Sequence, residues 1–216
     1  MFTGIVQATG TVETVEPRGG DVRLRVGCPA PVLQDLNTGD SIAVSGACLT
    51  AVEVDQTGFA ADVSRESLRL TTLGNLRVGS RVNLEKALTL STPLGGHLVT
   101  GHVDGVGQVL TRADEGRSFR FGVSVPGDLA RFVARKGSIC IDGVSLTVND
   151  VDRSRFEVNI VPHTLEVTNL NEWIPGRSVN LEVDIVARYL ERLLGDSRTG
   201  GLTLEKLKEA GFAESH

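Results

Sequence analysis

The chain has 216 residues, 40% of them hydrophobic and 23% charged, which is enough apolar material for two compact domains. Its net charge of -5 and its 4% aromatic content argue against a nucleic-acid surface, because such surfaces use clustered Lys and Arg and stacking aromatics. The sequence shows neither a secretory leader nor an apolar run of the roughly 18 residues that a membrane helix needs, so we expect a cytoplasmic protein without membrane partners.

The first half predicts short strands separated by turns. Polar and apolar residues alternate in D-V-R-L-R-V, residues 21–26, and in S-I-A-V-S-G, residues 41–46, which places one face of each segment on a core. A further β-rich run, L-T-A-V-E-V, occupies residues 49–54. Short helices are expected around residues 31–36 and 65–70. This pattern predicts an antiparallel barrel or sandwich.

The second half repeats the first at a constant step of 97 residues. The motif T-G-x-V at Thr3–Val6 returns at Thr100–Val103, and G-S-R-V-N-L-E at residues 79–85 returns as G-R-S-V-N-L-E at residues 176–182. A repeat of this length is a whole domain rather than a solenoid unit. We therefore expect two similar all-β domains and a tail. Their expected bounds are residues 1–96, 97–182 and 183–216.

The tail changes from a strand period to a helical one. In V-D-I-V-A-R-Y-L-E-R-L-L-G, residues 183–195, apolar side chains form one stripe, and Gly195 is expected to cap the helix. The stripe consists of Ile185, Val186, Tyr189, Leu190, Leu193 and Leu194. Such a face predicts burial, either against another chain or against the chain's own barrel.

Three cysteines are present without any C-x-x-C spacing. An odd, sparse set of this kind predicts neither a disulfide framework nor a zinc site, and we expect no bound metal. Cys140 stands between two isoleucines and is expected in a strand core, and Cys28 carries no functional signal. Cys48 lies in G-A-C-L-T, beside a glycine-rich turn.

An ordered set of motifs resembles the alpha-chain type of riboflavin synthase. They are M-F-T-G-I-V at the N-terminus, G-A-C-L-T at residues 46–50, G-H-V-D-G at residues 101–105 and G-V-S-L-T at residues 143–147. The similarity covers residues 1 to about 194. The resemblance implies an all-β chain of two six-stranded antiparallel Greek-key barrels in tandem, a C-terminal helix, and no cofactor.

The resemblance also implies an activity. Two molecules of 6,7-dimethyl-8-ribityllumazine dismutate in a transferase reaction, one giving a four-carbon unit to the other, and riboflavin and 5-amino-6-ribitylaminouracil are formed. The resemblance implies a homotrimer assembled by the C-terminal helix. Association with lumazine synthase is a further possibility that it raises. A non-catalytic lumazine- or flavin-binding protein of the same fold stays the alternative. A flavin-dependent reductase module is weaker, because no G-x-G-x-x-G unit links a strand to a helix.

Candidate catalytic residues lie where the two copies differ. At the 97-residue step Cys48 stands opposite Ser145, and His102 stands opposite an isoleucine. A Cys48 thiolate could add to an electron-poor ring carbon, and an imidazole moves protons near neutral pH, although a lone cysteine is more often a small buried hydrophobe. The resemblance implies catalytic roles for Cys48, His102, Ser145, Asp184 and Phe2. For Asp184 the alternative is an acidic residue in the first turn of a helix. Phe2 lies near a chain end, where residues are ordinarily frayed.

Ligand-binding segments carry over from the same resemblance. In the first copy they are Gly4, Ile5, Val6, Cys48, Leu49, Thr50, Asp62, Val63, Ser64, Arg65, Glu66 and Ser67. In the second copy they are Gly101, His102, Val103, Ser145, Leu146, Thr147, Ile160, Val161, Pro162, His163, Thr164 and Leu165, with Lys136 reaching in from a neighbouring chain. Hydroxyls and amides in these segments suit a ribityl chain. The structural alternative for residues 62–67 is a strand end followed by a helix cap.

Overall fold

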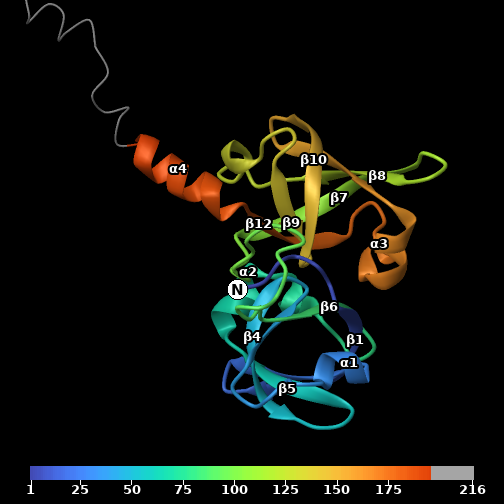
Figure 1. The fold of residues 1–216 in the computed structure, drawn as a ribbon, viewed down its shortest axis with the longest axis vertical. Helices are drawn as coiled ribbons and strands as arrows, with labels where there is room; N and C mark the ends of the chain where they lie inside the picture. Colours follow the sequence, from blue (N-terminus) through green and yellow to red (C-terminus); the bar gives the residue numbers. More distant parts are fainter. Residues whose placement is uncertain (196–216) are drawn as a thin grey trace, which may run out of the picture. The chain divides into compact units, whose positions relative to one another are not determined.

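The computed structural model describes residues 1–195 of the chain. A compact unit, Met1–Ile185, contains two closed barrels, and a second unit begins at Val186 (Figure 1). The strands pair antiparallel throughout both barrels. This confirms the predicted fold class of two six-stranded antiparallel barrels in tandem followed by a helix. Of the two architectures that the strand pattern allowed, each half is a barrel and not a sandwich.

In the first barrel the strands follow the order β1-β2-β5-β4-β3-β6, and β6 pairs with β1 to close the ring. In this Greek-key order β5, β4 and β3 lie between β2 and β6. The strands are β1 (Ala8–Arg18), β2 (Asp21–Gly27), β3 (Ser41–Val44), β4 (Ala47–Val54), β5 (Gly58–Val63) and β6 (Arg81–Lys86). The short helices are α1 (Ala30–Leu33), α2 (Arg65–Leu70) and the 3-10 turn η1 (Thr72–Asn75).

Both helices predicted for this half are present. The second matches its predicted bounds, whereas the first begins and ends earlier than residues 31–36. It ends early because Gln34 is extended and Asp35 adopts a left-handed conformation with φ 64°, which an α-helix cannot accommodate.

The second barrel repeats the strand order of the first, with every strand number raised by six. Its strands are β7 (Gly105–Asp114), β8 (Phe119–Ser124), β9 (Ser138–Ile141), β10 (Val144–Asp152), β11 (Arg155–Ile160) and β12 (Ser178–Val183). Between them lie η2 (Ala130–Phe132), α3 (Pro162–Val167) and η3 (Asn169–Glu172). The sequence repeat therefore corresponds to a repeat of topology.

Each barrel has its own apolar core. In the first, inward-facing residues such as Leu24, Ile42 and Phe59 are buried, as the alternating pattern predicts. In the second, Phe121 and Trp173 meet edge to face with ring centroids 5.5 Å apart. Fully burying one such side chain contributes about 1.5–3 kcal/mol, so the two cores are the main source of stability.

The barrels touch through a matched pair of hairpin turns. Ser45 and Gly46 join β3 to β4 with φ of 44° and 84°, and Asp142 and Gly143 join β9 to β10 with φ of 46° and 82°. Two consecutive positive φ values are typical of the type I′ turns that connect neighbouring strands. A Cβ added at Gly46 would lie 2.8 Å from the backbone nitrogen of Gly143, so only glycine permits this approach.

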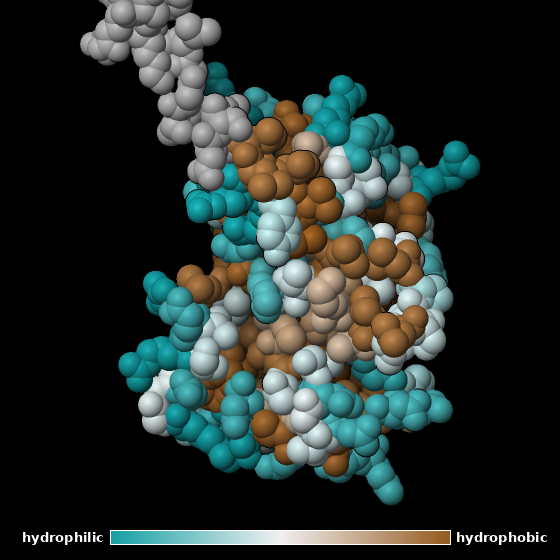
Figure 2. Space-filling view, turned by 60° about the vertical axis from the view of Figure 1, so that its left-hand side comes forward, coloured by the Kyte–Doolittle hydropathy of each residue, from teal (hydrophilic) through white to brown (hydrophobic). Residues whose placement is uncertain are grey.

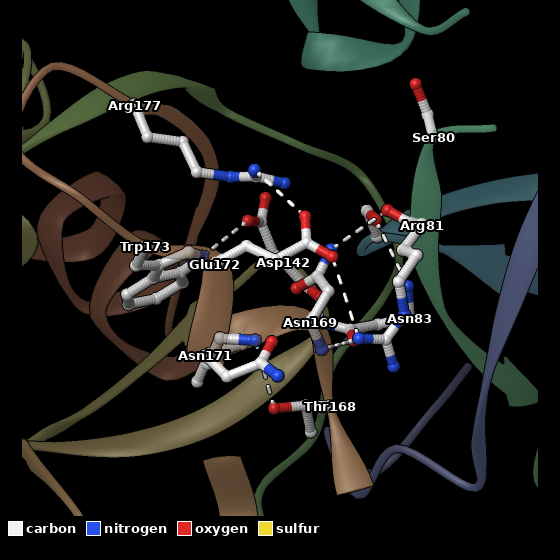
Figure 3. Close-up of polar contacts among 12 residues, drawn as sticks. Ser80, Arg81, Asn83, Asp142, Thr168, Asn169, Asn171, Glu172, Trp173 and Arg177 are labelled. Atoms are coloured by element: carbon white, nitrogen blue, oxygen red, sulfur yellow. Dashed lines mark hydrogen bonds and ion pairs between the residues drawn. The ribbon is translucent and has the colours of Figure 1, made fainter. Parts of the chain in front are cut away.

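Two asparagines join the barrels reciprocally around these turns. The Asn83 side-chain amide donates to the Asp142 carbonyl, and the Asn180 side-chain amide donates to the Ser45 carbonyl, both at 2.8 Å. Asn83 Oδ1 in turn accepts from the Asn169 backbone N–H at 2.8 Å (Figure 3). These buried hydrogen bonds fix one barrel against the other, because an unmade bond here would leave a polar group without water.

The helix predicted for the tail is α4 (Ile185–Gly195). It begins directly after β12 and one intervening residue, Asp184. Its apolar residues recur at helical spacing on one face. The predicted capping role of Gly195 depends on the conformation that follows, which lies outside the described residues.

Candidate functional site

Each barrel sends its T-G-x-V loop across to the other barrel. The Ser145 N–H donates to the Gly4 carbonyl at 2.8 Å, and the Cys48 N–H donates to the Gly101 carbonyl at 2.8 Å. Both glycines have positive φ, and a Cβ on either would lie 2.6 Å from the Cβ of the residue opposite. Matching by sequence grouped Gly4 with the first barrel; its N–H donates to Glu85 of that barrel at 3.0 Å, and its carbonyl accepts from the second barrel. Each candidate site therefore combines strands of one barrel with a loop of the other.

Two buried glutamates hold these crossing loops in place. Glu85 accepts hydrogen bonds from the backbone N–H and the hydroxyl of Thr3, at 2.6 and 2.7 Å. Glu182 accepts the same two bonds from Thr100, at 2.6 and 2.8 Å. Burial raises the pKa of both carboxyl groups, while these hydrogen bonds oppose the shift. This role was not predicted from the sequence, although both glutamates end the repeated V-N-L-E block.

In the first barrel, the predicted ligand segments lie on neighbouring strands. Thr50 lies on β4 and Asp62 on β5, which pair with each other, and Ser64 caps α2 by accepting from the Ser67 N–H at 3.2 Å. The Asp62 carboxylate is held by two hydrogen bonds from Arg23, at 2.7 and 2.8 Å. Residues 62–67 therefore do form a strand end and a helix cap. The hydroxyl oxygens of Ser64 and Ser67 lie 3.1 Å apart at this cap.

The second barrel offers a more apolar version of the same arrangement. Ile160 ends β11, beside the strand β10 that carries Ser145, Leu146 and Thr147. Val161 precedes α3 without a side-chain cap, and Pro162 opens that helix. Where the first site has charged and hydroxyl groups at Ser64, Arg65 and Glu66, the second has Val161, Pro162 and His163. The two sites thus share a backbone plan and differ in polarity.

A cavity of about 750 Å³ lies beside the crossing loop of the first barrel. Its lining includes Thr3, Ile5, Ser41, Glu85 and Lys86. Ser41 pairs with Thr50 across β3 and β4, so the cavity adjoins a predicted ligand segment. A volume in this range suits a bicyclic small molecule. Apolar side chains are exposed around the two loops, and Figure 2 shows that apolar surface covers much of one face of the molecule.

Three of the predicted catalytic residues meet where the loops cross. Cys48 is half-buried and packs against a cluster that contains Phe2 and Val99. Phe2 is fully buried, and its backbone exchanges hydrogen bonds of 2.7 and 3.1 Å with Val99. Phe2 is therefore an ordered part of the interface between the barrels, behind Cys48. His102 is exposed on the loop that contacts Cys48, and its N–H donates to the Thr100 hydroxyl at 3.2 Å.

Ser145 has a partner that sequence analysis did not select. Nδ1 of His97 lies 2.7 Å from Ser145 Oγ, and the His97 backbone N–H donates to the Thr3 carbonyl at 3.1 Å. Burial lowers the pKa of His97, and the negative charge of Asp184 opposes that shift. The predicted catalytic residues Ser145 and Asp184 therefore converge on this imidazole. Proximity in the fold, which a single sequence does not display, identifies His97.

Cys140 and Lys136 have simpler surroundings. Cys140 is fully buried in β9, as predicted, and burial raises the pKa of its thiol. Lys136 is exposed in a turn with φ 67°, and its role in a neighbouring chain stays a prediction. Across residues 1–195 no three His, Cys, Asp or Glu side chains are grouped as metal ligands. No helix in this range has the length and apolarity needed to cross a membrane.

Comparison with protein families places a lumazine-binding domain twice on this chain, at residues 3–87 and 100–184. Riboflavin synthase from Photobacterium phosphoreum is 40% identical over 216 residues, covering 98% of this chain and 99% of the relative. Riboflavin synthase from Mycobacterium bovis is 47% identical over 198 residues, with 90% and 98% covered. The protein from Bacillus subtilis with the same name is 37% identical, with 98% and 100% covered.

Solved structures agree with these sequence relatives. The structure of LumP complexed with 6,7-dimethyl-8-(1'-D-ribityl) lumazine matches with a TM-score of 0.77 and 27% identity, covering 85% of this chain and 99% of LumP. The complex of LumP with riboflavin matches with a TM-score of 0.79 and 28% identity, at the same coverage. Both barrels of this chain thus have counterparts in a ligand-binding protein.

Proposed function

We propose a riboflavin-forming activity for this chain, because it carries two lumazine-binding domains and belongs to the riboflavin synthase family. The observation that carries the proposal is the presence of two composite sites in one chain, each built from one barrel and a loop of the other. A reaction between two copies of one molecule needs two sites of similar shape and different chemistry.

The reaction is the dismutation of 6,7-dimethyl-8-ribityllumazine. One molecule gives a four-carbon unit to a second, so that riboflavin and 5-amino-6-ribitylaminouracil leave, and the enzyme is a transferase that needs no cofactor. Holding both rings in a reactive orientation can contribute about 7–11 kcal/mol to lowering the barrier. The two crossing loops support this role, because their backbone is fixed by Glu85 and Glu182.

Residue roles follow from chemistry and position. Cys48, half-buried at one crossing point, is a nucleophile or proton-transfer group, and exposed His102 on the facing loop transfers protons. Ser145 at the other crossing point polarises or attacks the second ring. Phe2 supports the Cys48 region from the buried side. The predicted ligand segments hold the ribityl chains through hydroxyls and backbone amides.

The assembly and setting are also proposals. Three chains join through the apolar stripe of α4, so that a barrel of one chain faces a barrel of the next and Lys136 reaches a neighbouring site. The protein works in the cytoplasm, and lumazine synthase is its candidate partner. The functional segments are residues 1–96 and 97–182, each centred on one barrel, with residues 183–216 serving assembly.

A binding protein without turnover is the second candidate, because solved LumP structures hold lumazine, riboflavin and flavin mononucleotide on the same fold. The two candidates separate when purified protein is incubated with the lumazine alone and riboflavin fluorescence is followed. An enzyme accumulates riboflavin beyond the protein concentration, whereas a binding protein produces none. Cys48→Ala and His102→Gln should each slow formation at least tenfold, while Cys140→Ala in the β9 core should keep the wild-type rate.

A further inference from the structure

A polar groove of about 320 Å³ lies between the two barrels. Thr72, Ser80 and Arg81 line it from the first barrel, and Glu172 and Arg177 line it from the second. None of its lining residues belongs to the predicted catalytic or ligand-binding set. The groove is therefore a cavity that the proposed reaction does not use.

The buried lining residues Asp142 and Asn169 form the floor of the groove, which has more hydrogen-bond acceptors than donors. Asn169 is 2% exposed, and its Oδ1 has no hydrogen-bond partner among the described residues. Its Nδ2 donates to the Arg81 carbonyl at 3.2 Å, so turning the amide over would bring two acceptors together. The Asp142 carboxyl accepts only from neutral groups, the Asn180 N–H and Trp173 Nε1. A buried acceptor without a donor is unfavourable, so the floor favours a ligand that donates hydrogen bonds.

The rim of the groove carries the opposite charge. Arg81 and Arg177 are partly exposed there, and Glu172 interacts with both. Glu172 Oε2 accepts from Arg177 Nη1 at 3.2 Å, and its Oε1 lies 3.6 Å from Arg81 Nη1 (Figure 3). Two positive charges and one negative charge leave the rim with one positive charge. Each guanidinium group has five N–H donors, so the rim can also bind an anionic group of a ligand.

The charge on the floor depends on Asp142. Burial raises its pKa to about 6, and the charge of Arg177 acts in the opposite direction. The carboxyl group is therefore ionised at pH 7.5, and no cationic side chain within residues 1–195 makes a hydrogen bond or an ion pair with it. A cationic donor suits this position better than a neutral one, because hydrogen bonds between opposite charges are the stronger kind.

We propose that the groove binds a small aminocarboxylate, a molecule with an ammonium group at one end and a carboxylate at the other. The ammonium group lies at the floor and donates to the Asp142 carboxylate and to Asn169 Oδ1. The carboxylate lies at the rim and accepts from Arg81 and Arg177. The volume of the groove suits a short chain between these ends. Such a ligand contacts both barrels and stabilises their association, whether or not the chain forms riboflavin.

Calorimetric titration of the full-length chain at pH 7.5 tests the site, with glycine, β-alanine and γ-aminobutyrate as probes. At least one of them should bind once per chain and at least about tenfold more tightly than the amine or the acid of the same chain length. Saturating riboflavin should leave this affinity unchanged, because the groove shares no residue with the predicted ligand segments. In wild-type protein the probe should also shift the backbone amide NMR signals of Thr72 and Asn169.

Two variants test the ends of the ligand separately. Asn169→Thr and Arg177→Ser each introduce the residue that the first copy has at the equivalent position, Thr72 or Ser80. Each should weaken binding of the aminocarboxylate at least about tenfold, and Arg177→Ser should leave binding of the amine unchanged. Arg77→Ser removes an exposed arginine that does not line the groove, and this control should keep the wild-type affinity.

Three results would overturn the proposal. The first is an absence of saturable binding by all three probes, which would show that the groove holds only water. The second is an amine that binds as tightly as the aminocarboxylate, because the rim would then play no part. The third is displacement of the probe by riboflavin, or NMR shifts confined to the crossing loops, because either would place the probe in the lumazine sites. The wild-type NMR shifts decide the matter even if a variant does not fold.

Discussion

Phe2 connects the chemistry of the first crossing point to the stability of the whole interface. Its ring is fully buried among Ala43, Val99 and Cys140, and its backbone bridges to Val99. A residue this close to a chain end usually contributes little. Here the contacts on both sides of the ring come from different barrels, so removal of the ring leaves a cavity between them.

Phe2→Ala should therefore destabilise the protein by about 3–5 kcal/mol, the usual range for a buried aromatic residue replaced by alanine. Denaturant unfolding of both proteins gives the difference in free energy. Phe119→Ala, which removes a half-buried ring from β8, should have a smaller effect. A loss below about 1 kcal/mol for Phe2→Ala would show that the ring does not carry the interface.

Asp142 is a buried carboxylate in the turn where the barrels meet. It accepts hydrogen bonds from the Asn180 N–H at 2.8 Å and from Trp173 Nε1 at 3.2 Å. It borders an inter-barrel groove of about 320 Å³, and Figure 3 shows it beside Trp173. Burial raises its pKa to about 6, against the opposing effects of the Asn180 amide and the charge of Arg177. The first barrel has Ser45 at the equivalent turn position.

The raised pKa predicts a pH-dependent stability. Because the folded pKa lies above the unfolded one, this carboxyl favours the folded state at low pH, and that advantage is lost as pH rises through about 6. In Asp142→Ser, this residue is replaced by its counterpart in the first copy. Relative to wild type, the variant should gain about 2 kcal/mol of unfolding free energy as pH rises from 4 to 7.5.

Unfolding free energies measured across that range check the prediction. Asp128→Ser removes an exposed carboxylate from the same barrel and should stay within about 0.5 kcal/mol of wild type at each pH. A constant difference between wild type and Asp142→Ser would contradict a titrating Asp142.

At the scale of the element, the crossing loops decide the shape of both sites. Gly101 combines a φ of 81° with a close approach to Cys48, whereas Gly79 has a φ of 89° and open space around it. A side chain at Gly79 meets only backbone strain, which costs about 1–3 kcal/mol. A side chain at Gly101 meets the same strain and also pushes the loop away from the first barrel.

Gly101→Ala should consequently weaken lumazine binding at the first barrel at least tenfold, while Gly79→Ala should destabilise the fold and leave affinity unchanged. Fluorescence titration with the lumazine, together with thermal unfolding, distinguishes strain from displacement. Equal affinities of the two variants would mean that the loop does not form part of the binding site.

The sequence predicts strands, helices and repeat well because these depend on local periods. The alternation in residues 21–26 and 41–46 requires only a barrel interior, and the 97-residue step requires only two similar folds. The exchange of loops between barrels is a long-range contact that no period encodes. Matching by sequence therefore grouped Gly4 with the first barrel alone, without its contact to Ser145 of the second. His97 was missed for the same reason, since its partner Ser145 lies 48 residues away. Phe2 was expected by resemblance, but its burial required the fold.

At the scale of the whole molecule, the apolar stripe of α4 is the feature that the barrels leave unexplained. Leu190 and Leu193 lie on this stripe, and Arg192 lies on the polar side of the same helix. A trimer joined through the stripe would bury its leucines and leave Arg192 in water.

Leu190→Asp combined with Leu193→Asp should therefore yield monomers that bind lumazine and turn it over far more slowly. Sedimentation and activity are measured on one sample, with Arg192→Asp as the control that keeps both assembly and rate. A wild-type monomer with full activity would refute a site shared between chains. A monomeric double variant with full activity would show that the helix serves assembly and is not needed for catalysis.

We propose that one chain type, acting on a single substrate, brings two identical molecules into two unlike sites. Chromatographic stoichiometry in a buffer free of added metals, nucleotides and flavins tests it most directly. We expect two molecules of 6,7-dimethyl-8-ribityllumazine to be consumed for each riboflavin and each 5-amino-6-ribitylaminouracil formed, over many turnovers. Recovery of unchanged lumazine, or riboflavin without the uracil product in equal amount, would contradict it.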